Sequence, residues 1–204
     1  MREAAALTAL RDGCAELRRW WPGEDVRAAA LASNHPSAYQ EVNELTELKL
    51  GRCSFTALPD AIGGLEKLQL LAISDCKRLT ALPESLGNLC ALQTLCLGDL
   101  ESFHELPPSI GALGALKTLE LVRCPRLEVL PDELGGLFVL ETLAVIHCRR
   151  LMGIPSSIGD LVYLKRLSLK GCSEVSPYVA FHDAIDMLAE CRLEVINLSF
   201  CKVA

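Results

Sequence analysis

The chain has 204 residues, of which 39 are Leu, while aromatic residues supply only 5%. Half of the residues are hydrophobic, which excludes a disordered chain, and no charge-free apolar stretch approaches the ~20 residues that cross a bilayer. A net charge of −6 argues against general nucleic-acid binding, and the first residues lack the apolar segment of a secretory signal.

Residues 1–44 are predicted to form an N-terminal helical cap and a linker. Five residues share one helix face through a 3-4-3-4 spacing: Leu7, Leu10, Cys14, Leu17 and Trp21. The following Pro22 and Gly23 end this helix. The helix is expected either to shield the open end of the next domain or to dock a partner.

From Leu45 onward the chain repeats, with a period of 24 residues. Three residue types recur at this interval: Pro59, Pro83, Pro107, Pro131 and Pro155; Gly63, Gly87, Gly111, Gly135 and Gly159; Leu65, Leu89, Leu113, Leu137 and Leu161. The sequence therefore predicts a solenoid over residues 45–204, with about six repeats and a partial last one.

Each repeat divides into a strand and a returning segment. In the unit that begins at Leu68, Leu71 and Ile73 are expected to point inward and Ala72 outward. One strand cannot bury its apolar side alone, so the copies are expected to stack in parallel as a curved sheet on a concave face. In the returning segment Pro83 fixes φ, Gly87 permits a tight turn, and leucines line a short helical or irregular back wall.

This pattern, L-x-x-L-x-L-x-x-C-x-x-L-x-x-L-P-x-x-I/L-G-x-L, resembles the leucine-rich-repeat family. The back wall is most similar to the repeats of plant nucleotide-binding resistance proteins and intracellular Ras-group repeat proteins. The resemblance implies an α/β leucine-rich-repeat solenoid and a role in signalling or defence response.

The C-terminal end departs from the 24-residue period. From Leu164 to the next strand at Leu193 is 29 residues, and Phe181 to Cys191 is predicted to be helical. The cysteines around the last strand, Cys172, Cys191 and Cys201, resemble those in the repeats of F-box proteins. This second resemblance implies an alternative function, the substrate-recognition subunit of a ubiquitin-ligase complex.

Six cysteines recur close to once per repeat: Cys53, Cys76, Cys124, Cys148, Cys172 and Cys201. A zinc site needs about four ligands that converge, and a linear ladder of thiols cannot converge, so no metal and no cofactor is predicted. The thiols are expected to be reduced, buried and weakly hydrogen-bonded to loop carbonyls, which favours a cytoplasmic location.

Leu100 stands where the ladder should carry a cysteine. The loop after it is therefore either a functional bulge or the result of ordinary drift. Because Leu cannot donate to a carbonyl, the ladder alone predicts that Leu100→Cys would stabilise the fold.

The outward positions of the strands and of the loops after them are candidates for binding a partner. Residues 117–170 carry eight Lys or Arg against six Asp or Glu, and stacking should place Arg123 beside His147 and Arg126 beside Arg150. Like charges in register repel one another unless a partner offsets them, and the alternative is a solvated loop edge. The predicted partner-binding residues are Arg123, Arg126, His147, Arg149, Arg150, Glu120, Asp99 and Asp75.

No catalytic motif is recognisable: the sequence lacks G-x-S-x-G, H-E-x-x-H and a phosphate-binding glycine-rich loop. We therefore expect no enzyme activity, no nucleic-acid partner and no membrane insertion. The sequence predicts a non-enzymatic protein-interaction module, an intracellular recognition or signalling scaffold whose concave face binds an acidic or phosphorylated protein. An effector that regulates another protein is a further alternative.

Overall fold

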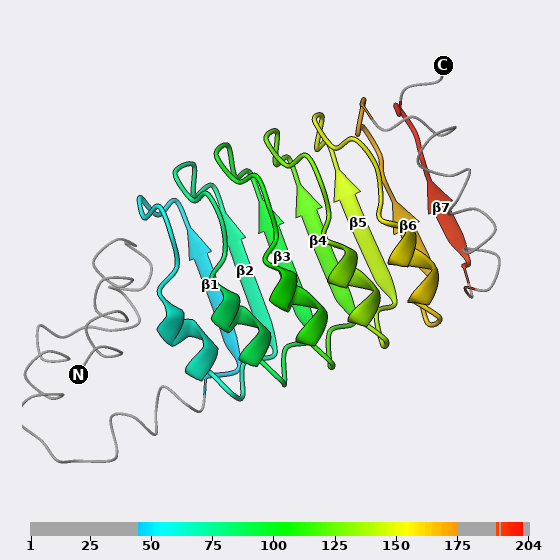
Figure 1. Ribbon diagram of the computed structural model, residues 1–204. Helices are drawn as coiled ribbons and strands as arrows, with labels where there is room; N and C mark the ends of the chain where they lie inside the picture. Colours follow the sequence, from blue (N-terminus) through cyan, green and yellow to red (C-terminus); the bar gives the residue numbers. More distant parts are fainter. Residues whose placement is uncertain (1–44, 175–190, 192, 202–204) are drawn as a thin grey trace, which may run out of the picture.

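The computed structural model describes residues 45–174, 191 and 193–201, which form an open parallel sheet backed by short 3-10 helices (Figure 1). The strands lie side by side in sequence order: β1 (Glu47–Gly51), β2 (Leu70–Ser74), β3 (Thr94–Gly98), β4 (Thr118–Val122), β5 (Thr142–Ile146), β6 (Arg166–Ser168) and β7 (Val195–Asn197). The helices form the second layer: η1 (Asp60–Gly64), η2 (Glu84–Asn88), η3 (Pro108–Ala112), η4 (Asp132–Gly136) and η5 (Ser156–Asp160). The predicted solenoid architecture is confirmed for these residues.

The strands alternate between the core and the sheet face, as the sequence predicts. In β2, Leu71 and Ile73 are buried, and Ala72 between them is only half-buried. The 24-residue period brings equal positions into register, so Leu71 pairs with Leu95 and Ala72 with Cys96. Each column of the sheet face therefore consists of the same position from successive repeats.

The back wall begins at the recurring proline. Pro83 has an extended backbone, with φ −73° and ψ 154°, and η2 starts directly after it. The returning leucines Leu82, Leu86 and Leu89 are all buried, so they close the core from the side opposite the sheet.

The recurring glycines have a different reason from the one the sequence suggested. Neither Gly87 nor Gly111 has a left-handed φ, so neither is required for a tight turn. A Cβ on Gly87 would lie 2.7 Å from the backbone oxygen of Ser109, and one on Gly111 would lie 2.2 Å from that of Glu133. Glycine is needed here because the backbone of the next 3-10 helix occupies the space that a Cβ would fill.

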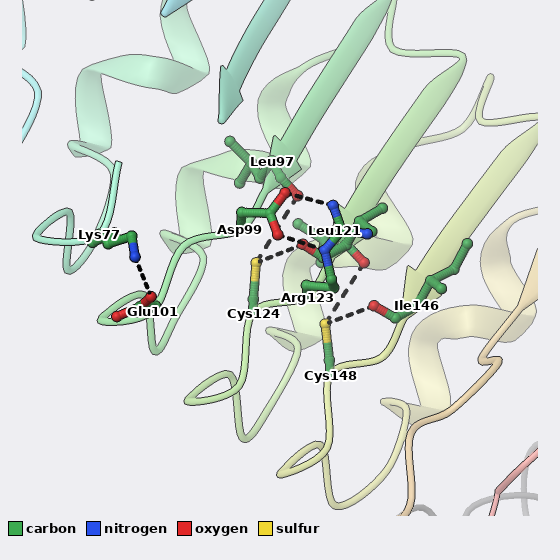
Figure 2. A network of polar contacts seen from close by, with 10 residues as sticks. Lys77, Leu97, Asp99, Glu101, Leu121, Arg123, Cys124, Ile146 and Cys148 are labelled. Atoms are coloured by element: carbon green, nitrogen blue, oxygen red, sulfur yellow. Dashed lines mark hydrogen bonds and ion pairs between the residues drawn. The ribbon is translucent and has the colours of Figure 1, made fainter. Parts of the chain in front are cut away.

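The cysteine ladder is buried and hydrogen-bonded to carbonyls, as expected. The Cys148 thiol donates to the oxygens of Leu121 and Ile146, with Sγ–O distances of 3.6 and 3.7 Å (Figure 2). A hydrogen bond with the neighbouring Cys124 thiol and burial both raise the pKa of Cys148, so it remains protonated.

Eight of the cysteines that the structure describes are free thiols. Cys53 is the exception, because its sulfur is disulfide-bonded. The expectation that every member of the ladder is reduced is therefore wrong for Cys53.

The loop after Leu100 follows the same path as the loops that begin with cysteine. Leu100 is fully buried, and the Phe103 N–H donates to its carbonyl, just as the Leu127 N–H donates to that of Cys124. Leu100 and Phe103 together fill the core with two large side chains where the next repeat uses Cys124 and Leu127. The backbone therefore shows no bulge at this loop.

Two predictions lie outside the described residues. The N-terminal cap falls in residues 1–44, and nearly all of the helix expected from Phe181 to Cys191 falls in residues 175–190. No helix among the described residues has the length and apolar character needed to cross a membrane.

Candidate interaction surface

One residue directly after each of the strands β1 to β5 adopts a left-handed backbone conformation. In five repeats this residue is not glycine, and its φ lies between 54° and 56°: Arg52, Asp75, Asp99, Arg123 and His147. The N–H of each of these residues donates to the sheet-edge carbonyl of the next repeat, as Arg123 does to Ile146 at 2.8 Å. Such a conformation costs ~1–2 kcal/mol for a residue with a Cβ. Its consequence is a row of polar side chains along the strand ends.

This row lines a groove of about 1050 Å³. The groove runs across the ends of β1 to β5, and residues of the adjoining loops, among them Lys77, Glu101 and Arg149, complete its wall. Five of the lining residues are basic or acidic side chains in the left-handed row, so each of the strands β1 to β5 contributes one such side chain to the groove.

Asp99 and Arg123 form the strongest ion pair of the groove. The guanidinium donates twice, from Nε to Oδ1 at 2.5 Å and from Nη2 to Oδ2 at 2.6 Å (Figure 2). The hydrogen bonds from Arg123 hold the pKa of the Asp99 carboxyl below its ordinary value. The expected stacking of Arg123 beside His147 holds for the backbone, but the Arg123 side chain turns to Asp99, so it does not contribute an uncompensated charge.

The loop residues show the same division between paired and unpaired cations. Arg150 donates to Glu128 at 2.5 Å, and Lys77 pairs with Glu101 at 2.9 Å. Arg126 and Arg149 are exposed, and neither forms an ion pair within the part of the chain that the structure describes. Of the four arginines predicted to bind a partner, Arg123 and Arg150 are therefore already neutralised by ion pairs. The surface offers fewer unpaired positive charges than the sequence suggests.

Glu120 lies apart from the groove, on the sheet face of β4. It is half-buried, and its register partners on the neighbouring strands are Cys96 and Ala144. The Cys96 thiol donates to Glu120 Oε2 at an Sγ–O distance of 3.6 Å. Burial and the charge of Glu120 raise the pKa of Cys96 to about 11, so this cysteine is a neutral donor.

The eight predicted residues thus separate into three groups. Asp75, Asp99, Arg123, His147 and Arg149 line the groove; Arg126 and Arg150 lie on exposed loops beside it; Glu120 belongs to the sheet face.

Three charged groove residues are absent from the predicted set: Arg52, Lys77 and Glu101. Arg52 occupies the column of Asp75, as the strand register shows, and this column was the signal that could have found it. Among the described residues no group of three or more His, Cys, Asp or Glu side chains could hold a metal ion.

The sequence matches no family model and no curated protein sequence. Two leucine-rich-repeat structures are among the solved structures that are similar to this chain. A leucine-rich-repeat protein of Leptospira interrogans matches with a TM-score of 0.55 and 26% identity, over 83% of this chain and 47% of its own. The leucine-rich-repeat ectodomain of the plant membrane receptor kinase GASSHO1/SCHENGEN3 from Arabidopsis thaliana, in complex with Casparian strip integrity factor 2, matches with a TM-score of 0.53 and 31% identity.

This chain is a leucine-rich-repeat protein. The match to the plant receptor covers 66% of this leucine-rich-repeat chain but only 16% of the receptor. The match to the Leptospira protein covers less than half of that protein. The similarity supports a protein-interaction module. The resemblances of this leucine-rich-repeat protein to resistance, Ras-group and F-box proteins remain predictions.

Proposed function

We propose that this leucine-rich-repeat protein is a non-enzymatic recognition module that binds an acidic segment of a protein partner along the strand-end groove. The observation that carries this proposal is the pair Arg126 and Arg149, exposed and without an ion-pair partner among the described residues. Arginine forms paired hydrogen bonds with carboxylate and phosphate groups, so these two side chains are free to bind such groups.

The charges of the groove give the bound segment a direction. Asp75 and Asp99, in the β2–β3 part of the groove, are each paired with an arginine, Arg52 and Arg123, whereas Arg149 at the β5 end, beside His147, has no ion-pair partner among the described residues. An acidic or phosphorylated residue of the partner is accommodated at the β5 end, where Arg126 lies close by in the preceding loop. The fixed backbone of the row keeps the ordering cost of binding low.

The plant receptor structure gives independent support for protein binding, because that leucine-rich-repeat domain was solved in complex with Casparian strip integrity factor 2. We propose the finer role of an intracellular recognition or signalling scaffold in the cytoplasm. Eight free thiols among the described cysteines favour a reducing compartment, while the disulfide-bonded Cys53 argues against it.

The test is affinity capture from a reducing cell lysate, with partners identified by mass spectrometry. The variant R126E/R149E reverses the two unpaired charges without breaking an ion pair of the described residues. The matched control, K117E/R166E, makes the same charge change at the opposite ends of the strands. The proposal expects a discrete partner set with wild type and the control that is lost with R126E/R149E. Equal capture by all three folded proteins refutes it.

A further inference from the structure

The sheet face carries one uncompensated carboxylate at its centre. Glu120 has a thiol on one side and the methyl group of Ala144 on the other, and no Lys, Arg or His side chain forms an ion pair with it among the described residues. The Cys96 hydrogen bond is neutral and long, so it offsets little of the carboxylate charge. A partner that covers this face must either pair Glu120 or bury an unpaired charge, which is strongly unfavourable.

A hollow lies directly beside this carboxylate. Its volume is about 120 Å³, and it is lined by residues of β2, β3 and β4, among them the short side chains of Ala72, Ser74 and Cys96 and the backbone of Gly98. Glu120 is one of the lining residues. This space corresponds to roughly four water molecules at ~30 Å³ each, which is enough for one unbranched side chain.

The geometry points to a docking site for a single basic side chain of the protein partner. The aliphatic stem of a Lys or Arg lies in the hollow along Ala72 and Gly98, and its charged end reaches the Glu120 carboxylate. Basic side chains combine an apolar stem with a polar end, which matches a mostly apolar hollow that has the Glu120 carboxylate among its lining residues. This inference rests on the proposed function and adds a second point of contact, of opposite charge to the Arg126–Arg149 end.

The test uses N-acetyl-lysine methylamide as the probe and N-acetyl-norleucine methylamide as its neutral counterpart, which has the same stem without the ammonium group. Binding is followed by the amide chemical shifts of the isotope-labelled protein. The lysine probe should shift the amides of Ala72, Gly98 and Glu120, and the norleucine probe should bind about three- to tenfold more weakly because the charge-assisted hydrogen bond is absent.

Two variants separate the carboxylate from the hollow. E120Q removes the charge at constant shape and should make the lysine and norleucine probes equal. G98V fills the hollow and retains Glu120; a Cβ at Gly98 meets only the Val122 oxygen at 3.9 Å, an ordinary contact. G98V should abolish the shifts for both probes, and A72M serves the same purpose if G98V does not fold.

Three outcomes overturn the inference: no shifts at the hollow up to the solubility limit of the probe, equal binding of the two probes to wild type, or shifts confined to the Asp75–Asp99 part of the groove. The variant R126E/R149E should bind the lysine probe like wild type, because neither arginine borders the hollow. A failure of the proposed function therefore appears in partner capture with R126E/R149E, and a failure of this inference appears in probe binding.

Discussion

The close approach of neighbouring 3-10 helices predicts that two glycines of one repeat respond oppositely to the same substitution. Gly111 lies in η3, and a Cβ placed on it would be 2.2 Å from the backbone oxygen of Glu133 in the next repeat. Gly114 lies three residues later, and a Cβ there meets nothing within 4 Å. Both have φ outside the left-handed region, so Ala strains neither backbone.

The magnitude follows from the distance. Real Cβ atoms essentially never approach closer than 3.0 Å, so the 2.2 Å contact requires the η4 backbone to move by about 0.8 Å. Overpacking of this kind costs about 1–3 kcal/mol, because the atom that must move is a backbone oxygen rather than the end of a flexible side chain. Gly114→Ala instead restricts the unfolded chain and should gain about 0.4–1 kcal/mol.

Thermal and urea unfolding followed by circular dichroism measure both effects. Each kcal/mol shifts Tm by about 2–4 °C in a protein of this size, so Gly111→Ala should lower Tm by about 2–12 °C. Gly114→Ala should leave Tm unchanged or raise it slightly. If Gly111→Ala unfolds at the same midpoint as Gly114→Ala, the close approach of the helices is not what requires glycine, and the reasoning fails.

Three further predictions concern the core and the groove. Leu100→Cys should lower the free energy of unfolding by about 1–2 kcal/mol, because the cavity left by a fully buried Leu outweighs one weak thiol hydrogen bond; a higher free energy of unfolding would restore the expectation drawn from the ladder alone. In Arg123→Gln the pKa of Asp99 should rise toward its ordinary value in an NMR titration. In the folded wild type this pKa lies below its ordinary value of 3.8. The contribution of Asp99 to stability is therefore present above pH 3.8 and is lost as the pH falls through the lower pKa of the folded state. An identical Asp99 pKa in the variant and in wild type would show that Arg123 does not stabilise the carboxylate. In thiol labelling of the native protein, exposed Cys90 should react quickly, whereas Cys172, buried and with its pKa raised to about 12, should react only after unfolding; simultaneous labelling of the two would contradict the burial of the ladder.

The repeat period predicted the fold because it fixes both the strand positions and their register. Leu71, Ile73 and the returning leucines are buried where the spacing places them, and the thiols reach carbonyls as a one-per-repeat donor should. The period also identifies which side chains share a column. These features depend on sequence position alone, which is why the sequence was sufficient for them.

The direction of long side chains could not be predicted in the same way. Arg123 has neighbours on both sides of its column, and only the structure shows that it pairs with Asp99 rather than facing His147. The sequence identified the recurring glycines, but the reason why glycine is required depends on the distance between the backbones of neighbouring 3-10 helices. The hollow beside Glu120 arises from short residues on β2 and β3, a combination visible only after the strands are paired.

Pairing in strict sequence order has a consequence for how such a protein changes length. Every described strand is hydrogen-bonded only to the strands before and after it, and each described 3-10 helix packs mainly against the helices before and after it. Removing or duplicating 24 residues therefore joins surfaces that already fit, because each repeat offers its neighbours the same pattern of carbonyls, leucines and glycine. Each added unit lengthens the sheet by ~4.8 Å and adds one new residue to every column. Natural variation can thus extend or shorten the binding face in fixed steps while the remaining repeats keep their packing.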